Sequence, residues 1–332
     1  MSTVMTVTGP ITADQLGRTL VHEHVRISYP GDHLDPTSNY DRANWLSIAC
    51  ERMEQLLDAG VRTFVDPCPI ELGRDPELLA EVAQRTGMQL ICATGFYMEH
   101  DAIGIPYYWR QRWEEEIAEY YLHEIEHGIG STGIHPGVIK VATGDPLGEH
   151  ERKVVHGAAT AAKDSGLPIV THTEHSTNGD FQQDVFEEVG VDLSRCLIGH
   201  QDEARDSNQL VAIAKRGSFV GVDRIGLEIL APDEQRLDHV ECLVESGHAD
   251  RVCLSQDHMC FTTGGRPAHW VPKERAEWYD REVRPKVVEQ AWGRPHTYLF
   301  TNFLPRLRER GVGDDVIDSI LIDNPRRLLA GE

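Results

Sequence analysis

His22 and His24 form a His-x-His pair at the end of an apolar run that begins near Thr19. Residues two apart on a β-strand point to the same face, so a strand over 19–24 would hold both imidazoles side by side. Two adjacent imidazoles are poor core packing but good metal ligands. The pair therefore predicts a metal site.

Four more polar residues stand within or at the end of short apolar runs that resemble strands. They are Lys140, His172, His200 and Asp257. In a (β/α)8 barrel the C-terminal ends of the strands converge on one axis, so residues far apart in sequence meet there. We therefore expect all six side chains to form one metal centre. The alternative is a set of core histidines with a buried salt bridge.

Lys140 lies in the apolar run 138–142. Burial of a lysine is costly when it is charged, and it lowers the pKa of the amine. A neutral amine beside two cations can react with carbon dioxide to give a carbamate, which is an anionic oxygen ligand able to bridge two metals. The sequence therefore predicts that Lys140 is a modified ligand.

Strands and helices alternate along the chain. Strands are expected at 19–24, 61–66, 88–94, 137–142, 168–173, 196–200, 218–223 and 251–256, and helices at 44–59, 75–86, 110–127, 149–165, 182–189, 206–216, 234–246 and 296–310. Eight βα units in a row favour an α/β fold of the (β/α)8 TIM-barrel type. No Gly-x-Gly-x-x-Gly follows the first strand, which disfavours a dinucleotide-binding fold. We expect a single domain over 1–332, with a tail at 312–330 of two short helices that a turn at 323–325 separates.

Two connections are unusually long for a compact domain. One covers 25–43, and the other covers 258–295 with a helical patch near 273–290. Long connections in compact domains are usually functional, and in a barrel both would overhang the metal site. We expect them to supply walls of a substrate pocket. The aromatic candidates are Trp270, Trp278, Tyr279 and Trp292.

Composition narrows the class of protein. The 332 residues carry a formal net charge of −22, which repels the phosphate backbone and argues against nucleic acid as a partner. Seven cysteines without a Cys-x-x-Cys pair give no disulfide framework or zinc knuckle. The first ten residues lack the pattern of a signal peptide, and no apolar stretch is long enough to span a membrane. We expect a cytoplasmic protein with no membrane partner.

The chain resembles the phosphotriesterase family of the amidohydrolase superfamily. The likeness runs from Gly9-Pro10 through His22-Glu23-His24 to the run 323–327. It implies a binuclear centre in which His22, His24 and Asp257 hold the more buried metal and His172 and His200 hold the more exposed one, with carbamylated Lys140 and a hydroxide as bridges. Zinc fits this donor set, as do cobalt, manganese and iron. The family also implies a homodimer.

What the resemblance implies for the reaction is hydrolysis. The metals would activate a water and polarise the scissile carbonyl or phosphoryl oxygen, and Asp257 would accept the proton. Other polar residues near the ligands are expected to support them rather than bind metal. They are Glu23, Glu174, His175 and His258.

Three features resemble the lactonase branch of the family. Tyr97 follows the third strand, Arg224 lies in an Asp-Arg motif after the seventh, and the connection 225–233 is short. The resemblance implies that Tyr97 and Arg224 bind substrate, although a structural pair of Asp223 with Arg224 is the alternative for that motif. Departures from the branch concern the shape of the pocket. They are Ile225, Gln256 and the run Gln201-Asp202-Glu203.

These observations predict a hydrolase of small lactones, above all N-acyl-homoserine lactones (quorum quenching), with incidental phosphotriesterase activity. An organophosphate phosphotriesterase or another carboxylesterase is the alternative. A TatD-like nuclease would have a carboxylate in place of Lys140, and a non-catalytic binding protein would have lost metal ligands.

Overall fold

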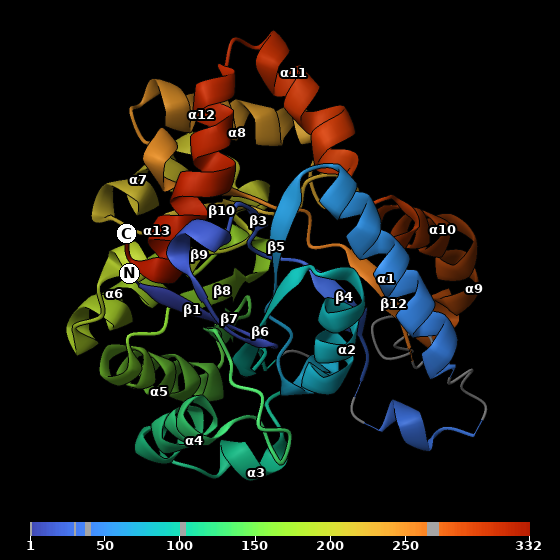
Figure 1. The fold of residues 1–332 in the computed structure, drawn as a ribbon, viewed down its shortest axis with the longest axis vertical. Helices are drawn as coiled ribbons and strands as arrows, with labels where there is room; N and C mark the ends of the chain where they lie inside the picture. The colour runs from blue at the N-terminus through green and yellow to red at the C-terminus, as the bar shows by residue number, and fades with distance from the viewer. Residues whose placement is uncertain (1, 30, 37–40, 100–103, 264–271) are drawn as a thin grey trace.

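Eight parallel strands form the centre of the fold, each paired with its neighbours in the chain (Figure 1). The computed structural model describes residues 2–29, 31–36, 41–99, 104–263 and 272–332. The first and last strands come together through backbone hydrogen bonds, from Asp257 N to His22 O (3.1 Å) and from His24 N to His258 O (2.8 Å). The sheet is therefore a nearly closed (β/α)8 barrel, as the sequence predicted.

The alternation of strands and helices matches the predicted order. The barrel strands are β3 (Arg18–Leu20), β5 (Val61–Asp66), β6 (Gln89–Gly95), β7 (Val138–Thr143), β8 (Ile169–Thr173), β9 (Cys196–Ile198), β10 (Phe219–Val222) and β11 (Val252–Leu254). The surrounding helices are α1 (Arg42–Asp58), α2 (Pro76–Thr86), α3 (Tyr107–Arg110), α4 (Glu114–His127), α5 (Glu149–Ser165), α6 (Gly179–Val189), α7 (Ser207–Arg216), α8 (Asp233–Glu245) and α11 (Leu304–Glu309).

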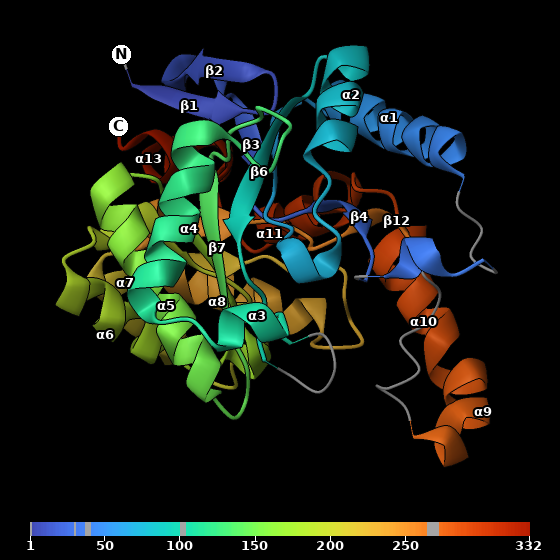
Figure 2. The ribbon, with the colours of Figure 1, turned by 90° about the horizontal axis from the view of Figure 1, so that it is seen from below.

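A hairpin closes the N-terminal end of the barrel. Its strands are β1 (Thr3–Thr6) and β2 (Gly9–Thr12), and the sequence analysis did not predict them. Val4 of the hairpin packs with inward-facing strand residues such as Val138 and Phe219, and Leu328 near the C-terminus joins the same cluster. Figure 2 shows both chain termini beside this hairpin. With one end closed by apolar residues, the opposite end of the barrel is left for polar chemistry.

The predicted strand over 19–24 is wrong at its end. β3 stops at Leu20, and His24 begins a separate strand, β4 (His24–Ile27), which pairs in parallel with β12 (Met259–Thr262). The bend between the two strands is held by Glu23, whose buried carboxylate accepts the backbone N–H groups of Gln256 (2.8 Å) and His258 (3.0 Å). The two long connections are therefore paired with each other, through β4 and β12, beside the C-terminal end of the barrel.

Residues 273–293, which we call the overhang, are helical, as predicted for 273–290. The overhang contains η9 (Lys273–Arg275), α9 (Ala276–Trp278), the π-helical turn η10 (Tyr279–Val283), α10 (Arg284–Val288) and the π-helical turn η11 (Glu289–Gly293). Figure 2 shows α9 and α10 projecting away from the barrel. The predicted wall residue Trp270 lies outside the described residues.

The predicted turn at 323–325 is wrong. A continuous helix runs through α12 (Asp314–Asp318), the π-helical turn η13 (Ser319–Asp323) and α13 (Asn324–Ala330), and Asn324 has helical angles (φ −63°, ψ −49°). A wider π-helical turn before Pro325 replaces the break that a proline usually causes. A similar turn, η12 (Leu299–Phe303), precedes α11. Among the described residues no helix combines the length and apolar composition that crossing a bilayer requires.

Candidate metal centre

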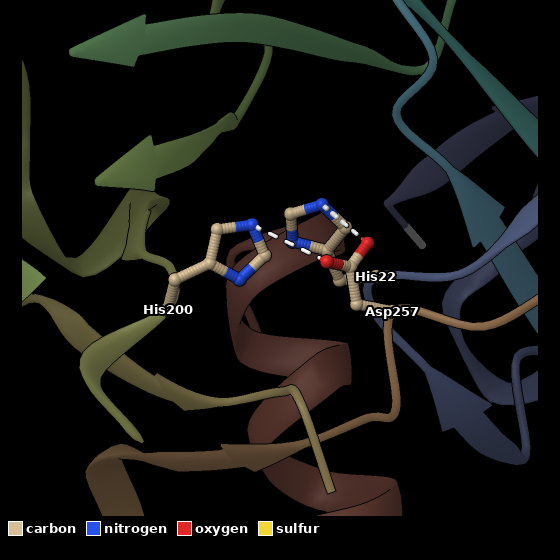
Figure 3. A group of neighbouring side chains, drawn as sticks. All are labelled: His22, His200 and Asp257. Carbon is tan, nitrogen blue, oxygen red and sulfur yellow. Dashed lines mark ion pairs between the residues drawn. The ribbon is translucent and has the colours of Figure 1, made fainter. Parts of the chain in front are cut away.

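The six predicted ligand residues meet at the C-terminal end of the barrel. Asp257 is central, because its carboxylate lies 3.2 Å from His24 Nε2, 3.8 Å from His200 Nε2 and 4.0 Å from His22 Nε2. Figure 3 shows His22 and His200 directed toward this carboxylate. The rings of His172 and His200 are 4.5 Å apart. Residues separated by more than two hundred positions in sequence thus surround one small volume.

Lys140 lies on β7 beneath the histidines, and its side chain is fully enclosed. Its Nζ atom is 3.1 Å from His22 Nε2, and the structure describes no carboxylate that forms an ion pair with it. An uncompensated buried ammonium group is strongly destabilising. The position therefore favours a neutral or modified lysine over a structural cation.

Two of the predicted ligand residues have left-handed backbone angles that non-glycine residues rarely adopt. They are His200 (φ 57°) and Asp257 (φ 53°), which follow β9 and β11 after those strands have ended. The predicted strands at 196–200 and 251–256 are accordingly too long at their C-terminal ends. Such strain persists only where the surrounding structure holds it, and it is concentrated at functional sites. Here it directs both side chains toward the barrel axis.

Carboxylates behind the histidines fix the orientation of the rings. Asp223 accepts from Nδ1 of both His22 (3.1 Å) and His200 (2.9 Å), and Asp66 contacts Nδ1 of His24 (3.3 Å). Nε2 of each ring is then left for the centre, which is the arrangement that orients metal-binding histidines. Asp66, at the end of β5, was not predicted, and the sequence offers no distinctive spacing that would have indicated it.

Arg224 does not pair with Asp223, so the structural alternative for that motif is wrong. Its Nε donates to Asp257 (3.1 Å) and its Nη1 to Glu203 (2.8 Å). Arg224 is buried, and it is not among the described residues that line the pocket above the centre. Its position allows it to hold Asp257 in place.

Tyr97 does line the pocket, and its ring meets the ring of His172 edge-on at 5.0 Å. The backbone N–H of Tyr97 donates to the buried carboxyl group of Glu71 (3.1 Å). Burial raises the pKa of Glu71 to about 8. Tyr97 is therefore fixed beside the expected ligand of the more exposed metal.

The four expected supporting residues lie around the centre. Glu174 contacts His172 Nε2 (2.9 Å), and His175 lies farther out, 3.1 Å from Glu203. Glu23 holds the bend between β3 and β4 as described above. His258 is buried with both ring nitrogens unpartnered among the described residues.

The ionisation of the centre follows from its burial. Burial, and then the charge of Lys140, lower the pKa of His22 to about 4, and burial lowers the pKa of Lys140 to about 8. Although burial alone would raise it, the pKa of Asp257 is held well below its usual range by His200 and by a hydrogen bond with His24. His22, His172 and His200 therefore favour the neutral form beside an ionised carboxylate, and these are the protonation states that bind divalent metals.

The donor set therefore fits divalent metal ions. Donor atoms of His22, His200 and Asp257 all lie within 4.8 Å of one another, and nitrogen with carboxylate oxygen suits zinc and neighbouring transition metals. The donor atoms of a second group, His24, Asp66 and Cys68, also lie within 4.8 Å of one another. The buried lysine without a carboxylate partner is explained if metals and a modified Lys140 complete the site.

Above the centre lies a cavity of about 570 Å³ with mostly apolar walls. Residues from both long connections line it, as predicted. They are Ile27, Tyr29, Met259, Thr262, Tyr279, Arg284, Val287, Val288, Ala291 and Trp292. Of the predicted aromatic wall, Tyr279 and Trp292 face the cavity, whereas Trp278 is exposed elsewhere on the overhang.

Comparison with known proteins places this fold and site. The family model "Phosphotriesterase family" matches residues 2–329. The chain is 31% identical to "Aryldialkylphosphatase" of Saccharolobus solfataricus over 96% of this chain and 97% of the other. It superposes with a TM-score of 0.88 on an organophosphorus hydrolase from Deinococcus radiodurans (36% identity; 99% and 97% covered).

A second solved structure is a mutant of a phosphotriesterase-like lactonase from Deinococcus radiodurans, with a TM-score of 0.87 and 34% identity over 98% of this chain and 99% of the other. The relatives thus include proteins named for phosphoesters and proteins named for lactones. The full-length family match and the buried histidine–carboxylate cluster agree. The chain belongs to the phosphotriesterase family, and it is a metal-dependent hydrolase.

Proposed function

We propose that the protein opens lactone rings, with N-acyl-homoserine lactones as its main substrates and weak activity on phosphotriesters. The observation that carries the proposal is the pairing of Tyr97, beside His172, with a largely apolar cavity. A lactone places a compact polar ring at the centre and an apolar chain in the cavity. The lactonase name of a similar structure supports this choice.

The proposed cofactors are two divalent metal ions, with zinc as the first candidate and cobalt, manganese or iron as substitutes. As the family resemblance implies, His22, His24 and Asp257 would hold one ion, and His172 and His200 the other. The closeness of Asp257 to His22 and His24, and of His172 to His200, is consistent with this division. Lys140, as a carbamate formed with carbon dioxide, would bridge them; its enclosure without a carboxylate partner supports this role. When bound, the metals lower the pKa of water and polarise the carbonyl oxygen of the substrate.

The side chains of this chain then have distinct tasks. Asp257 accepts the proton of the attacking water and passes it to the leaving oxygen. Arg224 holds Asp257 through its Nε and is itself held by Glu203, so it acts as a positioning residue. Tyr97 orients the lactone ring, and the apolar wall keeps bulk water from the reacting carbonyl.

The test is kcat/KM of the metal-loaded protein on long- and short-chain N-acyl-homoserine lactones, beside an aryl dialkyl phosphate. We expect the lactones to be preferred by several orders of magnitude. The second candidate, an organophosphate hydrolase, is favoured by the names of two relatives. A preference for the phosphate would establish it and would overturn the lactonase proposal.

Two further expectations belong to the proposal. They are a single domain over 1–332, from the unbroken alternation of strands and helices, and a homodimer, from the family resemblance. Size-exclusion chromatography with light scattering tests the dimer, and a monomer at micromolar concentration would contradict it.

A further inference from the structure

The outer part of the cavity carries a charge that the proposed lactonase reaction does not use. Among the described residues that line the cavity, Arg284 is the one formal charge outside the metal centre. It lies on α10 of the overhang, where its neighbours on the cavity wall are Val287 and Val288. A cation at the end of an apolar passage is a feature that an apolar acyl tail alone does not need.

Arg284 lies at the end of the cavity away from the metals. Ala291 and Trp292 belong to η11, which packs against β12 beside the centre. Seven residues separate Ala291 from Arg284, which is about 10 Å along a helix axis. Figure 2 shows α10 leading outward from β12. A chain running from the centre along this wall would thus pass Ala291 and the valines before it reaches the guanidinium group.

The guanidinium group is only loosely paired. Among the described residues it forms an ion pair with Asp280, at 3.7 Å, and the two side chains are 48% and 39% exposed. An exposed pair of this length is worth little, so a ligand carboxylate can compete for the guanidinium group. The planar guanidinium fork matches a carboxylate with two parallel hydrogen bonds.

Two tyrosines add hydroxyl groups to the same part of the cavity. Tyr29, from the first long connection, and Tyr279, from the overhang, both line it. The pKa of Tyr29 is raised to about 12 by burial and by the neighbouring Tyr279, so the hydroxyl group of Tyr29 stays protonated. Protonated hydroxyls are hydrogen-bond donors to an anion.

The overhang is also less acidic than the rest of the protein. Between residues 273 and 293 the sequence has five lysines and arginines and five acidic residues, in a chain whose net charge is −22. An anion that approaches by this segment meets less repulsion than it meets elsewhere on the surface.

We propose that the outer end of the cavity is a subsite for a carboxylate at the far end of the substrate's apolar chain, with Arg284 as its cation. The inference rests on the proposed function in one respect: the reacting group at the metal end is taken to be a lactone or another ester. The substrate class is then an ester whose acyl chain ends in an acid.

The test is calorimetric binding of decanedioate and of its monoamide to the metal-loaded protein. Both ligands have a carboxylate for the metal centre and the same length, but only decanedioate has a second charge. In the wild type we expect decanedioate to bind about fivefold more tightly, as a half-exposed ion pair allows. Arg284→Gln should remove this advantage, and Arg284→Glu should reverse it.

Lys286→Gln is the matched control, because Lys286 lies on the same helix but does not line the cavity. It should leave the ratio of the two affinities unchanged, and raised salt should reduce the ratio in the wild type. A ratio that is unchanged in Arg284→Gln, one that falls equally in Lys286→Gln, or an absence of decanedioate binding overturns the subsite. Binding needs no turnover, so failure of the lactonase assay leaves this result readable.

Discussion

The metal end of the barrel and the overhang differ in how firmly they are held. At the metal end, fully buried Asp202 bonds Arg236 and accepts the backbone N–H groups of Asp223 and Arg224. The overhang has mostly exposed side chains, and its charged pairs, such as Arg284 with Asp280, are exposed to solvent. Chemistry that is sensitive to small displacements lies in the rigid region, and contacts that choose a substrate lie in the loosely held one.

The largest effect on metal content and activity should come from replacing Lys140 at the metal end of the barrel. Lys140→Ala should lose metal and activity by more than the roughly 10–100-fold that loss of an outer-shell carboxylate typically costs. A short carboxylic acid added to the variant should restore part of both. Metal content, measured by elemental analysis, is the readout, and full occupancy in the variant would rule out the carbamate bridge.

A smaller loss of metal affinity is expected from a change in a residue that only orients the histidine rings. Asp223→Asn keeps the shape of the side chain but removes the charge that serves Nδ1 of His22 and His200. Metal affinity should fall by about 10–100-fold, as measured by competition with a chelator. Asp206→Asn, at an exposed helix N-cap, is the control and should leave the affinity unchanged.

Acid should destabilise the metal-free protein. Burial lowers the pKa of His22 and of His258 to about 4, against 6.5 in an unfolded chain, so the unfolded chain binds more protons between those values. Stability is therefore present above pH 6.5 and is lost as the pH falls toward 4, by at most about 1.4 kcal/mol per histidine for each pH unit. The raised pKa values of His24, Glu71 and Asp202 act in the opposite direction.

Urea unfolding of chelator-treated protein at pH 7.5 and pH 5 measures this effect. A free energy of unfolding that rises toward pH 5 would show that the buried groups with raised pKa values outweigh the buried neutral histidines.

At the border of the two regions, Tyr97→Phe tests the selection of lactones. The hydroxyl group should matter for a lactone ring and little for a phosphotriester, so kcat/KM should fall by about tenfold on lactones only. Arg224→Gln, acting through Asp257, should lower both activities. Equal losses on both substrates in Tyr97→Phe would remove its proposed role.

The smallest effect is expected on the overhang. Trp292→Ala removes an apolar wall residue of the cavity and should weaken the gain in kcat/KM from each added methylene group, which is worth up to about 0.8 kcal/mol when fully buried. A hexanoyl-to-dodecanoyl lactone series measures the slope. Trp278→Ala is the control, because Trp278 is exposed on the same segment. An equal change of slope in this variant would show that the acyl chain of the substrate does not lie against Trp292.

Much of this centre could be predicted from the sequence, because its candidate ligands lie within or directly after short apolar runs. Lys140 and His172 lie on strands as predicted, and all six side chains meet. The pairing of β4 with β12 was not predictable, because four-residue strands more than two hundred positions apart leave no periodic pattern. The supporting role of Asp66 was missed because a lone carboxylate at a strand end has no distinctive spacing.

The β4–β12 pair also bears on attempts to exchange loops between relatives. β12 is hydrogen-bonded to the strand that begins with the candidate ligand His24, and Gln256 binds the backbone at His296 and Leu299. These contacts flank the segment 263–293, which can be exchanged without altering them. A chimaera cut after Thr262 and before Arg294 keeps both sets of contacts, and it should have the substrate range of the donor and the metal affinity of the host. A cut inside β12 would disturb the host's own candidate ligand, His24.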